Sequence, residues 1–233
     1  MTVAGTAPWW LVAVVAVAGA AVGEVAARRL ATGGYRREDE QHLPVPPHRW
    51  WVPVLVALVW GSLAWRFGAV GHLTVLPAYL YLGVLGVLLA AIDADVHRLP
   101  DALVLPSYPV ALVLLAAASW GTGDWWSLVR AAMAGAALWL AYLVLALLSP
   151  GGLGFGDVKL AGVLGMYLGW LGWGPVVLAT LAAFLLGGLA GVVLLVARRV
   201  TRHSHIAFGP AMLAGAWLVV CVPVQLLTGS PTG

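Results

Sequence analysis

One uncharged apolar run in this sequence covers Leu73–Ile92, which is 20 residues. A helix needs about 20 mainly apolar residues to cross the hydrocarbon core of a bilayer. Similar runs recur along the chain, in which 62% of the 233 residues are hydrophobic and only 9% are charged. A soluble domain carries roughly 25% charged residues. The sequence therefore excludes a soluble globular protein and predicts an integral membrane protein.

We expect an all-α fold, namely a polytopic membrane bundle of about eight transmembrane helices that forms a single domain over residues 1–233. The predicted spans are Pro8–Ala27, Trp51–Phe67, Leu73–Ile92, Ala102–Trp120, Leu128–Leu148, Val158–Leu171, Pro175–Ala197 and Phe208–Leu227. Only short polar loops separate them, and the largest is Arg28–Arg49. The lipid bilayer is thus the first predicted partner.

The basic residues predict the orientation of these helices. Ten of the twelve Lys and Arg residues lie in loops 28–49, 93–101, 149–159 and 198–205. Lys and Arg accumulate in the cytoplasmic loops of membrane proteins. We therefore expect these four loops in the cytoplasm, both termini on the outer side, and the chain in the cell inner (plasma) membrane. The net charge of +3 follows from the same loops, so we expect no nucleic-acid partner.

Acidic residues are rare enough to be informative, and three of the nine lie just after the apolar run Leu73–Ile92. Asp93 directly follows that run, where the negative end of the helix dipole disfavours a carboxylate. An aspartate near hydrocarbon costs about 2.5–3.5 kcal/mol on insertion scales, which favours a functional role. Asp95 is also explained as a solvated loop residue. Asp101 follows Pro100 and resembles a helix N-cap.

The other acidic position in a predicted inner loop is Asp157, which follows a glycine-rich segment. Four of the six residues from 151 to 156 are glycine, which gives a backbone that another chain can approach closely. Asp157 is compatible with a helix N-cap and with a functional role alike. Lys159 is either an anchor at the inner face or a charge partner. The run Glu38–Glu40 is expected to be solvated.

One carboxylate on each of two inner loops suits an aspartyl dyad that activates water. Peptide hydrolysis needs one ionised carboxylate to take a proton from water and one protonated carboxyl group to polarise the scissile carbonyl. Neighbouring carboxylates achieve this by sharing a proton. We expect Asp157, at a helix N-terminus, to start as the base and Asp93, at a helix C-terminus, to start as the acid.

Three motifs in order along the chain resemble the type IV prepilin peptidases, which are polytopic membrane aspartyl proteases of the GxGD kind. The first is Ile92-Asp93-Ala94-Asp95 followed by Leu99-Pro100-Asp101, the second is Gly154-Phe155-Gly156-Asp157-Val158-Lys159-Leu160, and the third is Phe208-Gly209-Pro210. The two aspartates Asp93 and Asp157 are 64 positions apart, as in the layout of the family. The resemblance covers roughly Leu73 to Trp217.

This resemblance implies the residues of the site and the class of substrate. Asp93 and Asp157 would be the catalytic pair, and Gly154 and Gly156 would shape the cleft. Asp95, Asp101 and Lys159 are expected to be supporting residues. The implied substrate is a prepilin or pseudopilin, which has a short basic leader and then an apolar helix, cut at the cytoplasmic face of the membrane. We expect neither a cofactor nor a metal.

The polar loop departs from the family pattern. Many bifunctional members carry a larger cytoplasmic segment between the first two helices, with paired cysteines that are associated with methylation of the new N-terminus. Here the basic loop 28–49 is short and has no cysteine. The resemblance therefore implies the leader peptidase and leaves N-methyltransferase activity and oligomeric state open.

Two other interpretations of the acidic residues remain. In the first, Asp93 and Asp95 form a DxD pair that holds Mg²⁺ in an enzyme acting on lipid phosphates, although such sites usually need more acidic ligands. In the second, the chain is a polytopic transporter whose glycine-rich loops surround buried acids. No Gly- or Pro-interrupted pair of segments recurs in the two halves, and the acids cluster at one face.

Overall fold

A computed structural model describes residues 7–40, 44, 47–69, 71–148, 153–197 and 208–221, and these residues form helices and loops without a strand. The eight α-helices are α1 (Trp9–Ala31), α2 (Trp51–Ala69), α3 (Leu76–Val96), α4 (Asp101–Thr122), α5 (Trp125–Leu148), α6 (Phe155–Leu171), α7 (Trp173–Val196) and α8 (Gly209–Cys221), with a short 3-10 turn at Glu38–Glu40. The all-helical fold predicted from the sequence is confirmed.

Six of the eight helices are long and apolar enough to cross a membrane, namely α1 to α5 and α7. The chain is therefore a multi-pass membrane protein. Helix α6 has 17 residues and the described part of α8 has 13, so both fall short of that length. The end of the last predicted span at Leu227 and the predicted loop 198–205 lie outside the described residues.

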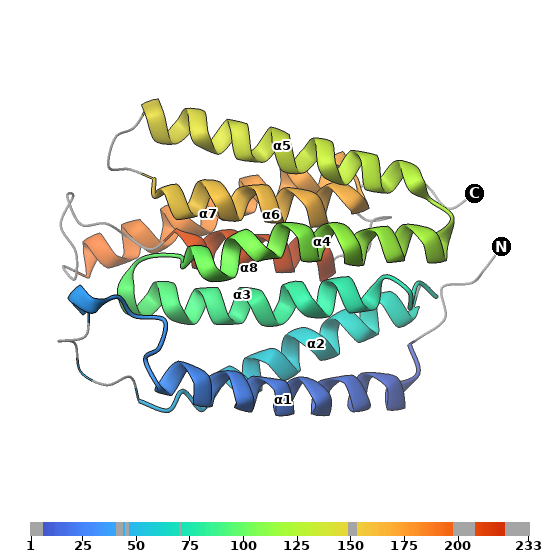
Figure 1. The fold of residues 1–233 in the computed structure, drawn as a ribbon, viewed down its shortest axis with the longest axis horizontal. Helices are drawn as coiled ribbons and strands as arrows, with labels where there is room; N and C mark the ends of the chain where they lie inside the picture. The colour runs from blue at the N-terminus through green and yellow to red at the C-terminus, as the bar shows by residue number, and fades with distance from the viewer. Residues whose placement is uncertain are drawn as a thin grey trace.

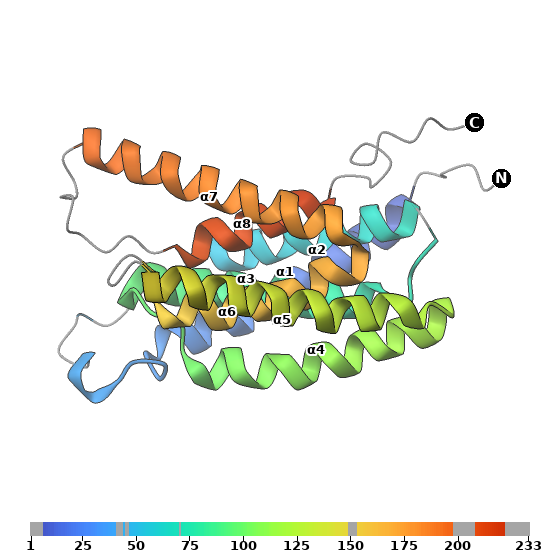
Figure 2. The ribbon, with the colours of Figure 1, turned by 90° about the horizontal axis from the view of Figure 1, so that it is seen from above.

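The helices run alongside one another as a bundle (Figure 1). The connections from α1 to α2 and from α3 to α4 lie at one end, and those from α2 to α3 and from α4 to α5 lie at the other. Helices α1 and α2 pack as one close pair and α7 and α8 as another, while α3 contacts α2, α4 and α8. Figure 2 shows α7 and α4 on opposite sides of α5 and α6.

Helix α6 is the buried centre of this bundle. Thirteen of its 17 residues are buried, although its sequence is no more apolar than that of its neighbours. Glycines allow the burial, because a Cβ on Gly165 would lie 2.6 Å from the backbone oxygen of Ala134 in α5. A Cβ on Gly169 would lie 2.4 Å from the Cβ of Ala134. Small residues let membrane helices approach closely, and here they press α6 against α5.

The two acidic segments that we predicted as loops belong partly to helices. We predicted that the third helix ends at Ile92, but α3 continues to Val96 and ends where His97 adopts a left-handed conformation with φ 50°. The amide of His97 donates to the carbonyl of Asp93 at 2.9 Å. Helix α6 begins at Phe155, three residues before the predicted start. Both shifts place the aspartates on rigid helical turns.

Candidate active site

Asp93 lies in the last turn of α3 and is buried, with only 4% of its surface exposed. Its Oδ2 atom is fully covered and accepts no hydrogen bond from any described residue. The backbone amide of Gly209, the first residue of α8, interacts with this carboxyl group. Buried polar atoms in folded proteins are nearly always paired. An unpaired carboxylate oxygen therefore points to a water molecule or substrate group that completes the site.

Asp157 lies in the first turn of α6, outside the six candidate spans, and is also buried. It is not the N-cap, which is Gly154. Instead its Oδ2 atom accepts a hydrogen bond of 3.2 Å from the backbone N–H of Gly154. A carboxylate three residues into a helix commonly satisfies the capping amide in this way. One carboxylate oxygen of Asp157 thus accepts a hydrogen bond at the start of its own helix, and the second oxygen remains for another contact.

Leu99 and two glycines bring the ends of α3, α6 and α8 together. A Cβ on Gly156 would lie 3.1 Å from the Cβ of Leu99, and a Cβ on Gly209 would lie 3.5 Å from its Cδ1. The same Cβ on Gly209 would lie only 2.8 Å from Oδ2 of Asp93. The Phe208-Gly209-Pro210 element and the glycine before Asp157 therefore meet at Leu99, next to Asp93.

The two carboxyl groups lie close enough for their charges to interact. Burial, and then the neighbouring Asp93 carboxylate, raise the pKa of Asp157 to about 6, while the amide of Gly154 opposes the rise. Burial and a like charge both disfavour the ionised form of an acid. The first turn of α6 favours an ionised carboxylate, but this effect does not outweigh burial and the like charge. Such a pair is suited to share one proton, and its titration belongs to the pair and not to either residue.

Asp95 does not face the dyad as a free carboxylate and is not a solvated loop residue. The hydroxyl of Tyr35 donates to its Oδ2 at 2.5 Å, and Arg36 and Arg49 form ion pairs with it at 3.0 and 3.2 Å. Arg49 also donates to the carbonyl of Ala91, in the turn before Asp93. Asp95 therefore fastens loop 28–49 to the end of α3.

A second ion pair strengthens this attachment. Arg98 donates to both carboxylate oxygens of Glu40 at 2.6 Å and to the carbonyl of Tyr35 at 3.0 Å. These hydrogen bonds lower the pKa of Glu40 to about 2. The expectation that Glu38–Glu40 is merely solvated is thus wrong for Glu40. No local pattern in the sequence signals these pairs, because each joins residues that are about 60 positions apart.

Asp101 and Lys159 form the remaining ion pair near the site, at 2.7 Å. Asp101 is the first residue of α4 and makes no capping hydrogen bond with its side chain, because the N-cap is Pro100. The N-cap interpretation of Asp101 is therefore wrong, and Lys159 acts as its charge partner. The hydroxyl of Tyr108 also donates to the carbonyl of Lys159 at 2.7 Å. These contacts hold the start of α6 against α4.

An aromatic cluster that sequence reasoning missed covers the other side of the site. The ring of Phe208 lies 5.3 Å from that of Phe184 and 6.5 Å from that of Tyr142. Tyr142 is buried and lies within electrostatic range of Asp157. The cluster packs α5, α7 and α8 against one another near Asp157.

In the structure, one of the two carboxylates of the predicted DxD metal site is not free to bind a metal ion. Mg²⁺ binding would need the Asp95 carboxylate, but two arginines and a tyrosine already occupy its oxygens. Within the described residues, no group of three or more His, Cys, Asp or Glu side chains is placed to hold a metal ion. What the site offers instead is two buried carboxyl groups whose charges interact, and Oδ2 of Asp93 has no hydrogen-bond partner among the described residues.

Comparison with known proteins finds a family that matches the segment containing this site. The model of the type IV leader peptidase family matches residues 79–192, which include both Asp93 and Asp157. Residues 79–192 of this chain are thus similar to the domain of that family. The resemblance seen in the sequence motifs is thereby confirmed. No solved structure matches the chain.

Several curated relatives share the name prepilin leader peptidase/N-methyltransferase. The one from Pseudomonas putida is 35% identical over 72% of this chain and 57% of its own length. The one from Neisseria gonorrhoeae is 33% identical over 72% and 55%, and that from Burkholderia pseudomallei (strain 1026b) is 36% identical over 74% and 54%. The chain thus spans little more than half the length of these relatives.

Proposed function

We propose that this protein is a membrane aspartic endopeptidase that removes the leader peptide from type IV prepilins or pilin-like precursors. The observation that carries the proposal is the pairing of Asp93 and Asp157, two buried carboxyl groups whose charges interact at the meeting point of α3, α6 and α8. The leader peptidase domain and the names of the relatives support the same reaction.

In the proposed mechanism, the two carboxyl groups share one proton and hold one water molecule. The ionised carboxylate takes a proton from the water as it attacks the scissile carbonyl. The protonated carboxyl group donates to the carbonyl oxygen and stabilises the charge that develops there. The helix ends assign Asp157 as the first base and Asp93 as the first acid, which stays a prediction, whereas the raised pKa of Asp157 favours the reverse assignment. Gly156 lets Leu99 pack closely beside Asp157, and Gly154 leaves the Asp157 carboxylate uncrowded, so both glycines would shape the cleft.

The proposed setting is the cytoplasmic face of the inner membrane. The charge bias of the loops supports it, because the ends of α3 and α6 that carry the dyad adjoin the basic segments. The ion pairs of Asp95 with loop 28–49 make this loop part of the site's wall. The location of both carboxyl groups at helix ends, and not half-way along them, favours an enzyme over a transporter. N-methyltransferase activity is not part of the proposal.

Co-expression with a prepilin from the same genome tests this function. Wild type should convert the precursor to a faster-migrating product on a gel, whereas Asp93→Asn and Asp157→Asn should each leave it uncut. Asp124→Asn is the matched control, because Asp124 caps α5 through Ser127 at the other end of the bundle. Normal conversion by either dyad variant, at an equal level of protein in the membrane, would overturn the proposal.

A further inference from the structure

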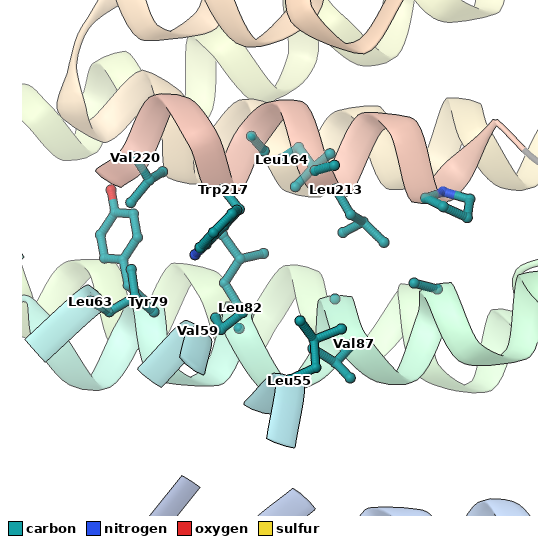
Figure 3. Close-up of a pocket in the computed structure, with 16 residues that line it drawn as sticks. Leu55, Val59, Leu63, Tyr79, Leu82, Val87, Leu164, Leu213, Trp217 and Val220 are labelled. Carbon is teal, nitrogen blue, oxygen red and sulfur yellow. The ribbon is translucent and has the colours of Figure 1, made fainter. Parts of the chain in front are cut away.

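An apolar groove runs along the bundle between α2, α3 and α8 (Figure 3). Its volume is about 350 Å³, and every lining residue except Tyr79 and Trp217 is without a polar side-chain atom. Leu55 and Trp217 on its rim are each 37% exposed, so the groove opens on the outside of the bundle. Within a membrane, this opening faces the acyl chains of the lipids.

A buried arginine, Arg66, lies just beyond the residues that line one end of this groove. Leu55, Val59 and Leu63 line it from α2 at four-residue spacing, and Arg66 is the next residue on the same helical stripe. Arg66 lies in the last turn of α2 and is 7% exposed. It interacts electrostatically with Tyr79, which lines that end of the groove.

This arginine lacks the acceptors that a buried guanidinium needs. Its Nε atom is fully covered and has no hydrogen-bond partner in the described part of the chain, where no acidic side chain forms an ion pair with it either. Its nearest cation–π partner is the ring of Phe67, 5.9 Å from the guanidinium carbon. Charged side chains within membrane helices are expensive and are usually paired.

Arg130 shows how the chain satisfies an arginine when the protein itself is the partner. It lies in α5 and donates to the carbonyls of Gly169 and Trp170 and to the hydroxyl of Ser127, all at 2.7 to 2.8 Å. Arg66 has no equivalent acceptors among the described residues. An anion supplied from outside the chain would satisfy it.

The length of the groove indicates which anion this is. From Leu55 to Arg66 the helix rises about 16 Å at 1.5 Å per residue. Half of the hydrocarbon core of a bilayer is about 15 Å thick. A groove that is apolar along the depth of one leaflet and ends at an unpaired cation matches the shape and charge of one phospholipid.

We propose that the groove between α2, α3 and α8 is a phospholipid site, in which Arg66 binds the phosphate group and the apolar stripe holds an acyl chain. The end with Arg66 is opposite to the end that carries Asp93, because Pro210 lines the other end of the groove next to Gly209. The site is thus separate from the dyad, and it holds whether or not the chain cleaves a prepilin.

Native mass spectrometry of the full-length protein, extracted in mild detergent and titrated with phosphatidylglycerol, tests the proposal. Wild type should bind one phosphatidylglycerol molecule tightly, and diacylglycerol with the same chains should bind at least about tenfold more weakly because it has no phosphate. Arg66→Gln should weaken phosphatidylglycerol binding by about tenfold or more, since a charge-assisted hydrogen bond is lost. Arg66→Lys should restore most of it.

Three further variants separate the site from general effects on the fold. Ala214→Phe fills the groove from α8 and should also remove the bound lipid, whereas Ala137→Phe, at an exposed position of α5, should not. Arg130→Gln should lower stability but leave lipid binding intact. The proposal is overturned if Arg66→Gln binds phosphatidylglycerol as wild type does. It is equally overturned if an apolar helical peptide occupies the groove while phospholipid does not.

Discussion

Substitution of Gly209 by alanine perturbs the dyad directly without removing a carboxyl group. Gly209 begins α8, and an added Cβ would lie 2.8 Å from Oδ2 of Asp93. Ordinary van der Waals contact begins at 3.4 Å, so either the carboxylate or the start of α8 must move by about 0.6 Å. The buried position of Asp93 leaves it little room to turn away.

The expected magnitude follows from this displacement. A misplacement of about 1 Å in a catalytic group can cost on the order of 10²-fold in rate, so a shift of about 0.6 Å should cost roughly tenfold. Overpacking of a buried position costs about 1–3 kcal/mol, and we expect the low end because α8 begins at this residue. Gly209→Ala should therefore fold, insert into the membrane and cleave slowly.

Cleavage of a purified prepilin in detergent measures this effect, with the rate taken at saturating substrate. Gly188→Ala is the matched control, because a Cβ at that exposed position of α7 meets no atom within 4 Å. It should cleave at the rate of wild type. If Gly209→Ala also cleaves at the wild-type rate, the active form of the protein does not hold Gly209 against Asp93, and the catalytic site has a different arrangement.

Three further outcomes are expected from the same structure. Gly165→Ala should lower the free energy of unfolding by about 1–3 kcal/mol, because its Cβ would lie 2.6 Å from a backbone oxygen of α5. The variant should therefore have a lower Tm than Gly188→Ala. An unchanged Tm would contradict the close packing of α6 against α5. The pKa of Glu40 is lowered to about 2 from 4.5, so its pair with Arg98 stabilises the loop fully above pH 4.5 and is lost as the pH falls toward 2. Pepsin should therefore cut loop 28–49 of the wild-type protein only at the acid end of this pH range. It should cut the same loop of Arg98→Gln throughout the range. If the loop of Arg98→Gln resists pepsin as that of wild type does, the pair of Glu40 and Arg98 does not stabilise the loop. Because the pKa of Asp157 is raised to about 6, cleavage should fall as the pH rises above this region and the dyad loses its shared proton; a rate that is constant from pH 5 to 10 would exclude a shared proton.

The sequence predicted the class of the fold and the family better than the local structure around the candidate site. Apolar runs of membrane length are a strong signal, and the helices follow them closely, as in α2 and α5. Helix ends are less predictable, because a polar residue can continue a helix when another segment neutralises it. Asp95 does so in α3, where Arg36 and Arg49 pair with it from the α1–α2 loop.

The contacts that build the site join residues far apart in the sequence, and no local pattern reveals them. Leu99 lies between Gly156 and Gly209, and Glu40 pairs with Arg98. Each contact depends on how whole helices pack. The motif around Asp157 marked a site but did not distinguish an N-cap from its actual place in the first turn of α6. Single-domain organisation over residues 1–233 and the orientation of the termini stay predictions.

The central claim is that Asp93 and Asp157 act as one unit on one water molecule, and a double-mutant cycle on the cleavage rate tests it most directly. Residues that act as a unit are strongly non-additive. Asp93→Asn, Asp157→Asn and the double variant should therefore share the same residual rate, at or near the background without enzyme. A double variant that is slower than each single variant by the product of their separate effects would show two independent contributions and contradict the dyad.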